Sequence, residues 1–336
     1  MITLGIETSC DETAVAVLKD KTILSNVISS SMHLHKRYGG VVPEIATRFH
    51  VEVINYCLKE AIKKAGIGLK GIDLVSVTQG PGLIGAVLIG ISFAKALTYS
   101  LNIPIIGTNH VIAHLWANFL TEHTPGFPFV GLVVSGGHTS LILVKGLNRY
   151  QILGQTQDDA AGEAFDKVAK LLELGYPGGP IIEKRAKEAG FSKMAKFSAL
   201  YSTDNLSLDF SFSGIKTEVL YYVRDKGGVE NLSKDEISEI AFSFQEAVCD
   251  AVVNKTMAAC KTKRIKNLVI GGGVSANLRL RKKLTEAALL NGVNFFIPPL
   301  NLCLDNAAMT AVLGYELFKS SIRSDLFISG FANFNS

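Results

Sequence analysis

The apolar positions of the chain fall into short runs that end in glycine or small polar residues, and several of these runs lead into longer segments with helical spacing. Strand-like runs cover residues 72–78, 103–107 and 267–270. Helical patterns cover residues 43–65, 82–101, 110–120, 162–172, 181–189, 235–262 and 305–319. Because strands and helices alternate, the pattern predicts an α/β fold with mostly covered sheets.

Two segments of the chain repeat the same pattern. Residues 5–18 can be laid over residues 131–144 without a gap, and each segment reads as an apolar strand, a turn of small polar residues and a second apolar strand. This is the pattern of a β-hairpin. Identical residues recur at Gly5 and Gly131, Ser9 and Ser135, and Thr13 and Thr139. We therefore expect two related domains, each opening with a hairpin.

The length of 336 residues also favours two domains of ordinary size. The pattern breaks near residues 122–128, where prolines and a glycine interrupt it. We expect a first domain at residues 1–125 and a second at 126–310. The last helical segment, about residues 311–336, is expected to pack back on the first domain.

Mean hydropathy is positive, so a membrane-spanning segment has to be considered. The richest apolar stretch, residues 83–97, is interrupted by Gly85, Gly90, Ser92 and Lys95. It falls short of the ~18 uninterrupted apolar residues expected of a spanning helix. The first residues lack the basic start and long apolar stretch of a secretory signal. We expect a soluble, cytoplasmic protein that does not bind membranes.

Cysteine content and net charge exclude only a few classes of function. The five cysteines include no CxxC pair, which argues against a disulfide framework and a thiolate zinc site. The net charge of +4 permits nucleic-acid binding without indicating it. Basic clusters lie at residues 33–37, 261–266 and 279–283. Each is either a solvated helix face or a nucleic-acid contact.

Four glycine-rich turns follow or connect strands, at residues 79–82, 135–138, 176–180 and 271–275. Glycine lets a phosphate approach bare backbone N–H groups. None of the turns has the P-loop pattern or the dinucleotide spacing GxGxxG. The hairpin turn at 135–138 together with the strand-to-helix loop at 271–277 nevertheless predicts nucleotide binding. The phosphate would lie on the hairpin and the nucleoside near the later loop.

A pair of histidines is the clearest candidate for metal binding. His110 and His114 are spaced i, i+4, which places both imidazoles on one face of a helix, where they can bind one ion. Val111 occupies the position of the glutamate in the HExxH zinc-peptidase motif, so the general base of that motif is absent. Asp305 offers a third ligand, but it also lies at a predicted helix start, where aspartate commonly acts as the N-cap. Both interpretations of Asp305 stay open.

The motifs, taken together and in order, resemble the bacterial TsaD (Gcp/YgjD) family, the tRNA N6-adenosine threonylcarbamoyltransferases. They lie at residues 5–13, 39–44, 79–83, 110–114, 134–139, 158–166, 176–180, 212–216 and 271–277. The resemblance implies an actin-like ATPase (ASKHA) fold, with two RNase H-like lobes and a cleft for nucleotide and metal between them. It also implies transfer of threonylcarbamoyl from threonylcarbamoyl-AMP to N6 of adenosine 37 in tRNAs that read ANN codons.

The resemblance assigns residues and partners as well. It implies that His110, His114 and Asp305 bind one divalent metal ion, with Fe²⁺ expected first and Zn²⁺ second. ATP, AMP or threonylcarbamoyl-AMP would be bound by Val133, Val134, Ser135, Gly136, Gly137, Asp166, Gly179, Glu183 and Asn277; other members usually have aspartate where this chain has Glu183. The implied partners are tRNA, a TsaB paralogue that forms a heterodimer, the TsaE ATPase, and a TsaC-type enzyme that supplies threonylcarbamoyl-AMP. We expect the protein partners on the helices of the first lobe, including residues 43–65.

The general base is the least defined part of the site. Glu12 and Asp11, in the first hairpin turn, could take the proton from the amine or could cap the turn. Three other functions remain as alternatives: a small-molecule kinase of the same fold, a metallopeptidase, and a scaffold that organises partner proteins without catalysis. The kinase and the scaffold have no need of His110 and His114.

Overall fold

The computed structural model describes residues 1–189, 197 and 207–333. Its contacts divide the chain into two compact units. Unit 1 contains Met1–Thr124 and Pro298–Ser336, and unit 2 contains Pro125–Ile297. The chain returns to unit 1 at Pro298, earlier than the position near residue 311 that the sequence suggested. Asp305 therefore belongs to unit 1.

Unit 1 is built on a five-stranded mixed sheet in the order β3-β2-β1-β4-β5. The strands are β1 (Ile2–Glu7), β2 (Glu12–Lys19), β3 (Thr22–Ser30), β4 (Leu74–Gly80) and β5 (Ile105–Asn109). The first three form an antiparallel meander, and β4 and β5 run parallel to β1. The carboxyl ends of β1, β4 and β5 therefore lie at one edge of the sheet, and the chain turns there into the segments that carry the candidate site.

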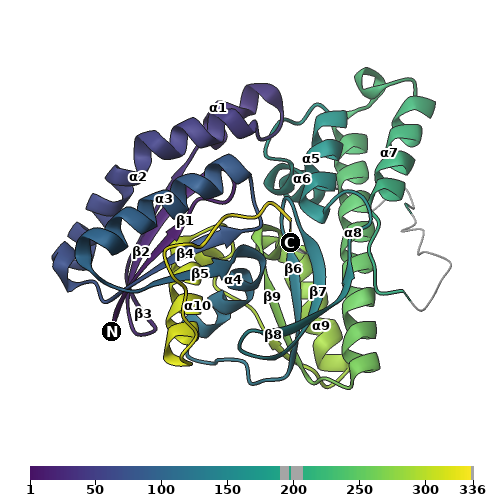
Figure 1. Ribbon diagram of the computed structural model, residues 1–336. Coiled ribbons are helices and arrows are strands. Elements are labelled where there is room, and N and C mark those ends of the chain that lie inside the picture. Colours follow the sequence, from purple (N-terminus) through teal and green to yellow (C-terminus); the bar gives the residue numbers. More distant parts are fainter. Residues whose placement is uncertain (190–196, 198–206, 334–336) are drawn as a thin grey trace. The chain divides into compact units, whose positions relative to one another are not determined.

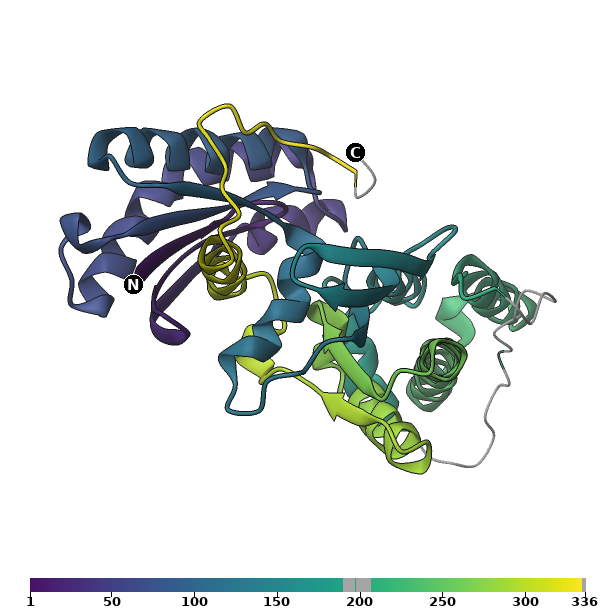
Figure 2. The same ribbon diagram turned by 60° about the horizontal axis from the view of Figure 1, so that its bottom comes forward.

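Helices cover both faces of this sheet (Figures 1 and 2). The helices of unit 1 are α1 (Met32–His35), α2 (Pro43–Ala65), α3 (Ile84–Leu101), α4 (His110–Trp116) and α10 (Ala307–Lys319), with short 3-10 turns at Lys36–Tyr38, Leu69–Gly71, Ala117–Leu120 and Leu300–Leu302. The helices α2 and α3 pack on one face, and α10 crosses β1 and β4 on the other. Both faces are therefore covered, which explains why β1, β2 and β4 are almost wholly buried.

The helix α3 is long and apolar enough to cross a membrane if length and composition alone are considered. In the structure it packs against β4 and α2. Its Gly90 lies so close to the backbone after β1 that a Cβ atom there would overlap the hydroxyl oxygen of Thr8. One side of the helix thus packs into the core of unit 1.

Unit 2 repeats the sheet order of unit 1, β10-β9-β6-β7-β8. Its strands are β6 (Phe129–Val134), β7 (Thr139–Gly146), β8 (Arg149–Gln155), β9 (Asn267–Gly271) and β10 (Asn294–Phe296). Again the first three strands form an antiparallel meander, and the last two run parallel to the first. The two units therefore share one topology, in which β1 corresponds to β6 and β4 to β9.

The opening hairpins of the two units also share their register. Glu7 pairs with Ala14 across β1 and β2, and Val133 pairs with Ser140 across β6 and β7. These pairs coincide when residues 5–18 are laid over residues 131–144 without a gap. The expectation of a hairpin at the start of each related unit is confirmed, and Val133 is the structural equivalent of Glu7.

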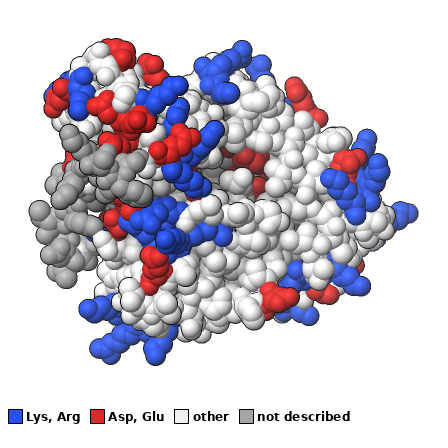
Figure 3. Space-filling model, turned by 180° about the vertical axis from the view of Figure 1, so that it is seen from behind, with Lys and Arg blue, Asp and Glu red and all other residues white. Residues whose placement is uncertain are grey.

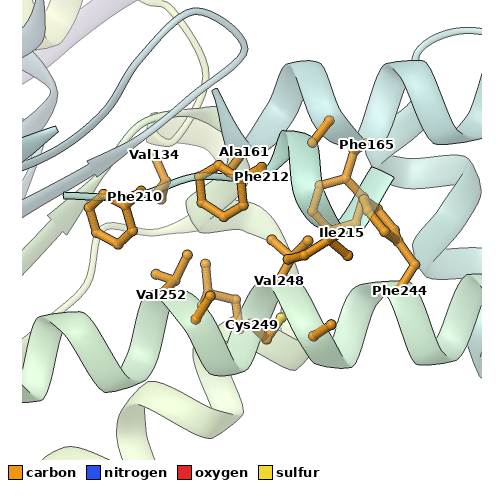
Figure 4. Close-up of a cluster of buried hydrophobic side chains, with 14 of the residues drawn as sticks. Val134, Ala161, Phe165, Phe210, Phe212, Ile215, Phe244, Val248, Cys249 and Val252 are labelled. Atoms are coloured by element: carbon orange, nitrogen blue, oxygen red, sulfur yellow. The ribbon is translucent and has the colours of Figure 1, made fainter. Parts of the chain in front are cut away.

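The core of unit 2 forms between its sheet and a layer of helices. These are α5 (Ala161–Leu171), α6 (Gly178–Lys187), α7 (Ser213–Asp225), α8 (Lys234–Lys263) and α9 (Leu278–Leu290), with 3-10 turns at Val229–Asn231 and Gly273–Ala276. Figure 4 shows apolar side chains of α8 packed against aromatic rings from neighbouring segments. Phe165 and Phe244 meet edge to face, with ring centroids 5.1 Å apart. The aromatic contacts fix α5 against α8.

Candidate functional site

Three potential metal ligands converge in unit 1. His110 and His114 lie on α4, which begins directly after β5 and is capped by Asn109, whose side chain accepts a hydrogen bond from the backbone N–H of Ile112. The two rings are buried, and their centroids are 4.7 Å apart. Asp305 Oδ1 lies 3.2 Å from His114 Nε2 and 3.8 Å from His110 Nε2. The potential ligand atoms of all three residues lie within 4.8 Å of one another.

Asp305 is not the cap of the helix that follows it. The N-cap of α10 is Asn306, whose side chain accepts a hydrogen bond of 3.1 Å from the backbone N–H of Met309. The Asn306 amide also donates to the carbonyl of Leu304 at 2.8 Å. The local interpretation of Asp305 as an N-cap was therefore wrong, because its neighbour performs that role. The Asp305 carboxylate is free to face the two histidines.

His114 provides a test of whether these residues fit a metal ion. Both of its ring nitrogens are buried, and neither forms a hydrogen bond of acceptable geometry among the described residues, although Asp305 Oδ1 lies 3.2 Å from Nε2. Buried polar atoms are seldom left in this state. An ion between the three residues would complete the coordination of His114 Nε2, and two imidazoles with one carboxylate suit zinc or ferrous iron. The site therefore fits a divalent metal ion.

The second ring nitrogen of His110 faces a buried polar cluster. His110 Nδ1 lies 3.2 Å from Glu7 Oε2 and 3.0 Å from Ser9 Oγ. Burial opposes protonation of His110, but the carboxylates of Glu7 and Asp305 outweigh it and raise the pKa of the histidine to about 9. Burial likewise opposes ionisation of Glu7, yet the attraction of His110 lowers the pKa of that carboxyl. The two groups thus stabilise each other's charged forms.

The turn between β1 and β2 lies beside this cluster. Burial, followed by the negative charges of Asp11 and Asp305, raises the pKa of Glu12 well above its usual value. The hydroxyl of Ser30 donates to Glu12 Oε1 at 3.1 Å. Burial, Asp11 and Asp305 also raise the pKa of Cys10, so its thiol stays protonated. The influence of Asp305 on both groups places the turn within electrostatic range of the metal ligands.

Two further buried histidines hold this turn, and sequence analysis did not single them out as site residues. His50 of α2 interacts with both ends of the turn: its Nε2–H donates to the carbonyl of Cys10 at 3.0 Å, and its Nδ1 lies 2.7 Å from Thr13 Oγ1. His35 Nε2 lies 2.9 Å from Ser31 Oγ, which donates to the carbonyl of Asp11. Burial lowers the pKa of both histidines. They therefore act as neutral hydrogen-bonding groups.

The predicted nucleotide-binding residues all belong to unit 2. Val133 and Val134 end β6, and the turn after them is closed by hydrogen bonds between Ser135 and His138 of 2.8 and 3.0 Å. A Cβ atom built at Gly136, Gly137 or Gly179 would meet no atom within 4 Å. The backbone at these glycines is thus open to a ligand, as a phosphate-binding turn requires.

The remaining predicted positions make hydrogen bonds within unit 2. Asp166 accepts a hydrogen bond of 2.6 Å from the N–H of Gly178, at the start of α6. Glu183, one turn further along α6, accepts one of 3.0 Å from the N–H of Leu278. Asn277 caps α9 and donates to Gln245 Oε1 at 2.9 Å. The helix α5, which carries Asp166, also contacts the turn after β6, since the N–H of Gly162 donates to the carbonyl of Ser135 at 3.1 Å, and Asn277 follows the end of β9.

The basic clusters at residues 279–283 and 261–266 differ in how far their charge is already paired. Arg279 and Lys283 form ion pairs with Glu246, at 2.5 and 2.8 Å. For residues 261–266, no ion pair is found within the part of the chain that the structure describes. On the face shown in Figure 3, basic and acidic side chains are interspersed. The charge distribution alone therefore does not identify a nucleic-acid surface.

Comparison with known proteins identifies the family. The sequence model of the family described as TsaD, tRNA N6-adenosine threonylcarbamoyltransferase, matches residues 22–312. The chain belongs to this family. A protein of that name from Dictyoglomus turgidum is 51% identical over 334 residues, which cover 98% of this chain and 97% of that protein. Another, from Clostridioides difficile, is 48% identical over 336 residues, covering 99% of this chain and 98% of that protein.

Solved structures support the fold of this TsaD family member. Full-length HypF, in its phosphate- and nucleotide-bound form, superposes with a TM-score of 0.62 at 15% identity, covering 96% of this chain and 56% of that chain. Component A of (R)-2-hydroxyglutaryl-CoA dehydratase from Acidaminococcus fermentans gives a TM-score of 0.55 at 16% identity, with 94% and 98% of the two chains covered. At such low sequence identities, these structures support the fold and nothing beyond it. The chain has the two-lobed actin-like ATPase (ASKHA) fold, as expected.

Proposed function

We propose that this chain transfers the threonylcarbamoyl group of threonylcarbamoyl-AMP to N6 of adenosine 37 in tRNAs that read ANN codons. Membership of the TsaD family supports the reaction type. The convergence of His110, His114 and Asp305 is the single observation that carries the proposal, because a small-molecule kinase or a scaffold needs no such site. The HExxH glutamate of a zinc peptidase is absent, since Val111 occupies its position.

We assign the three ligands to one divalent metal ion, with Fe²⁺ as the first expectation and Zn²⁺ as the second. When bound, such an ion supplies a Lewis acid that polarises a carbonyl group and stabilises developing negative charge. The residues of the chain fix its position. His110 and His114 come from adjacent turns of α4, and Asp305 approaches from the segment before α10.

The remaining steps are assigned to the hairpin turns of the two units. In the reaction, N6 of adenosine forms a bond to the carbamoyl carbon, the bond from that carbon to the phosphate oxygen breaks, and AMP leaves. We assign the phosphate, and that of ATP or AMP, to the turn Ser135–Gly137, where the backbone is open at Gly136 and Gly137. We assign the N6 proton to Glu12, since a raised pKa makes its carboxylate more basic than that of an ordinary glutamate. Asp11 contributes the negative charge that helps to raise that pKa.

The proposal extends to partners and compartment. The substrate tRNA and the TsaC-type enzyme that makes threonylcarbamoyl-AMP are found in the cytoplasm, where we place this chain. A TsaB paralogue and the TsaE ATPase would assemble with it, and we assign the paralogue to the exposed side of α2. We assign the metal ligands of unit 1 and the nucleotide-binding residues of unit 2 to the same reaction.

A reconstituted reaction tests the proposal. The purified chain, its partners, tRNA, threonine, bicarbonate, ATP and the adenylate-forming enzyme should yield threonylcarbamoyladenosine, measured by nucleoside mass spectrometry. His114→Gln should lose at least about a hundredfold in rate, because one ligand of the metal ion is missing. His123→Gln is the matched control, since His123 is exposed and lies outside the site.

Three outcomes would contradict the proposal. One is the absence of product from the metal-loaded chain while the Clostridioides difficile relative, in the same mixture, forms it. The other is an unchanged rate for His114→Gln, which would favour the scaffold. Phosphate transfer from ATP to a small molecule without tRNA would favour the kinase.

A further inference from the structure

Glu7 is a fully buried carboxylate at the end of β1, and sequence analysis did not assign it a role. Its Oε1 accepts a hydrogen bond of 2.7 Å from the N–H of Ser9. Its Oε2 accepts hydrogen bonds from Thr78 at 2.5 Å and Thr310 at 3.3 Å, and it lies 3.2 Å from His110 Nδ1. No lysine or arginine of residues 1–189, 197 and 207–333 forms an ion pair with Glu7. A carboxylate in such a position is costly, because burial removes it from water.

The second unit provides an internal control for this position. Val133, the equivalent of Glu7 in the register of the hairpins, is equally buried in the sheet of unit 2. The shared topology therefore does not require a polar side chain at the end of this strand. The carboxylate of Glu7 is not explained by the sheet, and its reason has to be sought in what it contacts.

Its contacts fix the carboxylate from three sides. Thr78 belongs to β4, Thr310 belongs to α10, and the N–H of Ser9 follows β1 itself. With its oxygens held in this way, Glu7 presents a fixed acceptor to His110 Nδ1. The other nitrogen of the same ring, Nε2, faces Asp305 at 3.8 Å.

We propose that Glu7 is a positioning residue for His110. An ionised carboxylate only accepts hydrogen bonds, so the proton of the ring lies on Nδ1 and the lone pair of Nε2 is directed at the metal ion. Partners of this kind orient metal-bound histidines in general. The inference rests on the metal site assigned in the proposed function. It adds that the first strand, through Glu7, determines which nitrogen of His110 binds the ion.

Ser9 is the competing partner, because its Oγ lies 3.0 Å from the same Nδ1. If the Ser9 hydroxyl donated to Nδ1, the proton would lie on Nε2, and that nitrogen could not bind the ion. Comparing Glu7→Gln with Ser9→Ala therefore separates the two arrangements. His123→Gln again serves as a control at an exposed histidine.

The first measurement is the affinity for Zn²⁺, obtained by competition with a chromophoric chelator at neutral pH. Glu7→Gln should bind zinc about 10- to 100-fold more weakly than the wild-type chain, the usual effect of losing such a partner. Ser9→Ala and His123→Gln should stay within about threefold of wild type, because Glu7 keeps the ring in place. Equal affinity of Glu7→Gln and wild type, or a loss confined to Ser9→Ala, would overturn the inference.

The second measurement needs no variant of Glu7, so it remains decisive if Glu7→Gln does not fold. Long-range ¹H–¹⁵N NMR of the zinc-loaded wild-type chain reports which ring nitrogen carries the proton, and His110→Gln identifies the signals of His110. We expect the proton on Nδ1 and zinc on Nε2. Zinc on Nδ1 would refute the role of Glu7. Failure of the wild-type chain to bind zinc would instead refute the metal site, and the inference with it.

Discussion

At the scale of single residues, the site depends on buried polar side chains that hydrogen-bond to one another and to the backbone. His50 illustrates this. It is fully buried on α2 and hydrogen-bonds to Cys10 and Thr13, the residues that flank Asp11 and Glu12. Because a carbonyl only accepts, Nε2 of His50 carries the proton and Nδ1 accepts from the Thr13 hydroxyl. The turn with the proposed base is thus held from a neighbouring helix.

We predict that His50→Leu destabilises the chain by about 2 kcal/mol, because the carbonyl of Cys10 and the hydroxyl of Thr13 lose their partner in a buried place. Urea unfolding followed by circular dichroism measures the free energy of unfolding. The variant should also lower the rate of tRNA modification while zinc affinity stays the same, since the metal ligands are untouched. An exposed-site control, His123→Leu, should unfold at the wild-type urea concentration. The prediction would be contradicted if His50→Leu and His123→Leu had the same free energy of unfolding.

At this scale, the sequence predicted the potential metal ligands but not the residues that surround them. The spacing of His110 and His114 is local, so one turn of helix is enough to bring them together. Asp305 could not be separated from a helix cap until the structure showed Asn306 in that role. Glu7 and His50 were assigned no role, because a polar residue of this kind is identified as part of a site only by what lies next to it in space.

At the scale of secondary-structure elements, α8 and α9 are joined by a charged cluster. Glu246 of α8 faces Arg279 and Lys283 of α9. Burial alone would raise the pKa of Glu246, but hydrogen bonds from Arg279 and Lys283 lower it below its usual value. Asn277 and Glu183, two of the predicted ligand-binding residues, hold the start of the same helix α9. The cluster therefore stabilises the helix on which part of the site depends.

The pH dependence follows from the sign of this shift. A carboxyl whose pKa is lower in the folded state contributes its stability above its unfolded pKa of about 4.3, and it loses that stability as pH falls through the lower folded value. Glu246→Gln should therefore be less stable than wild type at pH 6, by about 2 kcal/mol. Below pH 4 the difference should shrink. Urea unfolding at pH 6 and pH 3 checks this, and a difference that grows toward pH 3 would contradict it.

The elements that the sequence pattern missed have physical reasons in common. In α9 only Leu280, Leu284 and Ala288 are buried, a narrow stripe among basic residues, so the segment read as a charge cluster. The strands β8 and β10 lie at the edges of their sheet, and β10 has three residues. A segment with few buried residues has only a weak hydrophobic periodicity, so its element is hard to predict. The helix expected at residues 43–65 has a clear periodicity, and it was found as Pro43–Ala65.

At the scale of the whole molecule, the chain is a duplicated fold whose two copies have diverged in chemistry. The same strand order holds in both units, but the first carries the metal ligands and the second the predicted nucleotide turn. The helix α2 has two large apolar side chains exposed, with Val51 at 55% and Tyr56 at 61%. They lie on the helix to which we assign the TsaB paralogue.

We predict that Tyr56→Glu prevents formation of the heterodimer with the TsaB paralogue, because a charge replaces an apolar contact in the interface. Size-exclusion chromatography with light scattering measures the complex. Zinc affinity should remain that of wild type, since Tyr56 makes no contact with the metal ligands. Lys70→Glu, an exposed change elsewhere in unit 1, is the control and should leave the heterodimer intact. A stable heterodimer with Tyr56→Glu would place the partner on another surface.

The sequence by itself determined what depends on neighbours along the chain. Hydrophobic spacing located most helices and the two hairpins, and the i, i+4 spacing of His110 and His114 gave half of the metal site. Only the tertiary structure decided what depends on neighbours in space. Pairing of β1 with β4 and packing of α10 bring Glu7, Thr78 and Thr310 to His110, and the return of the chain at Pro298 brings Asp305. Local patterns record burial and turns, but the convergence of distant polar groups is fixed by strand order and helix packing.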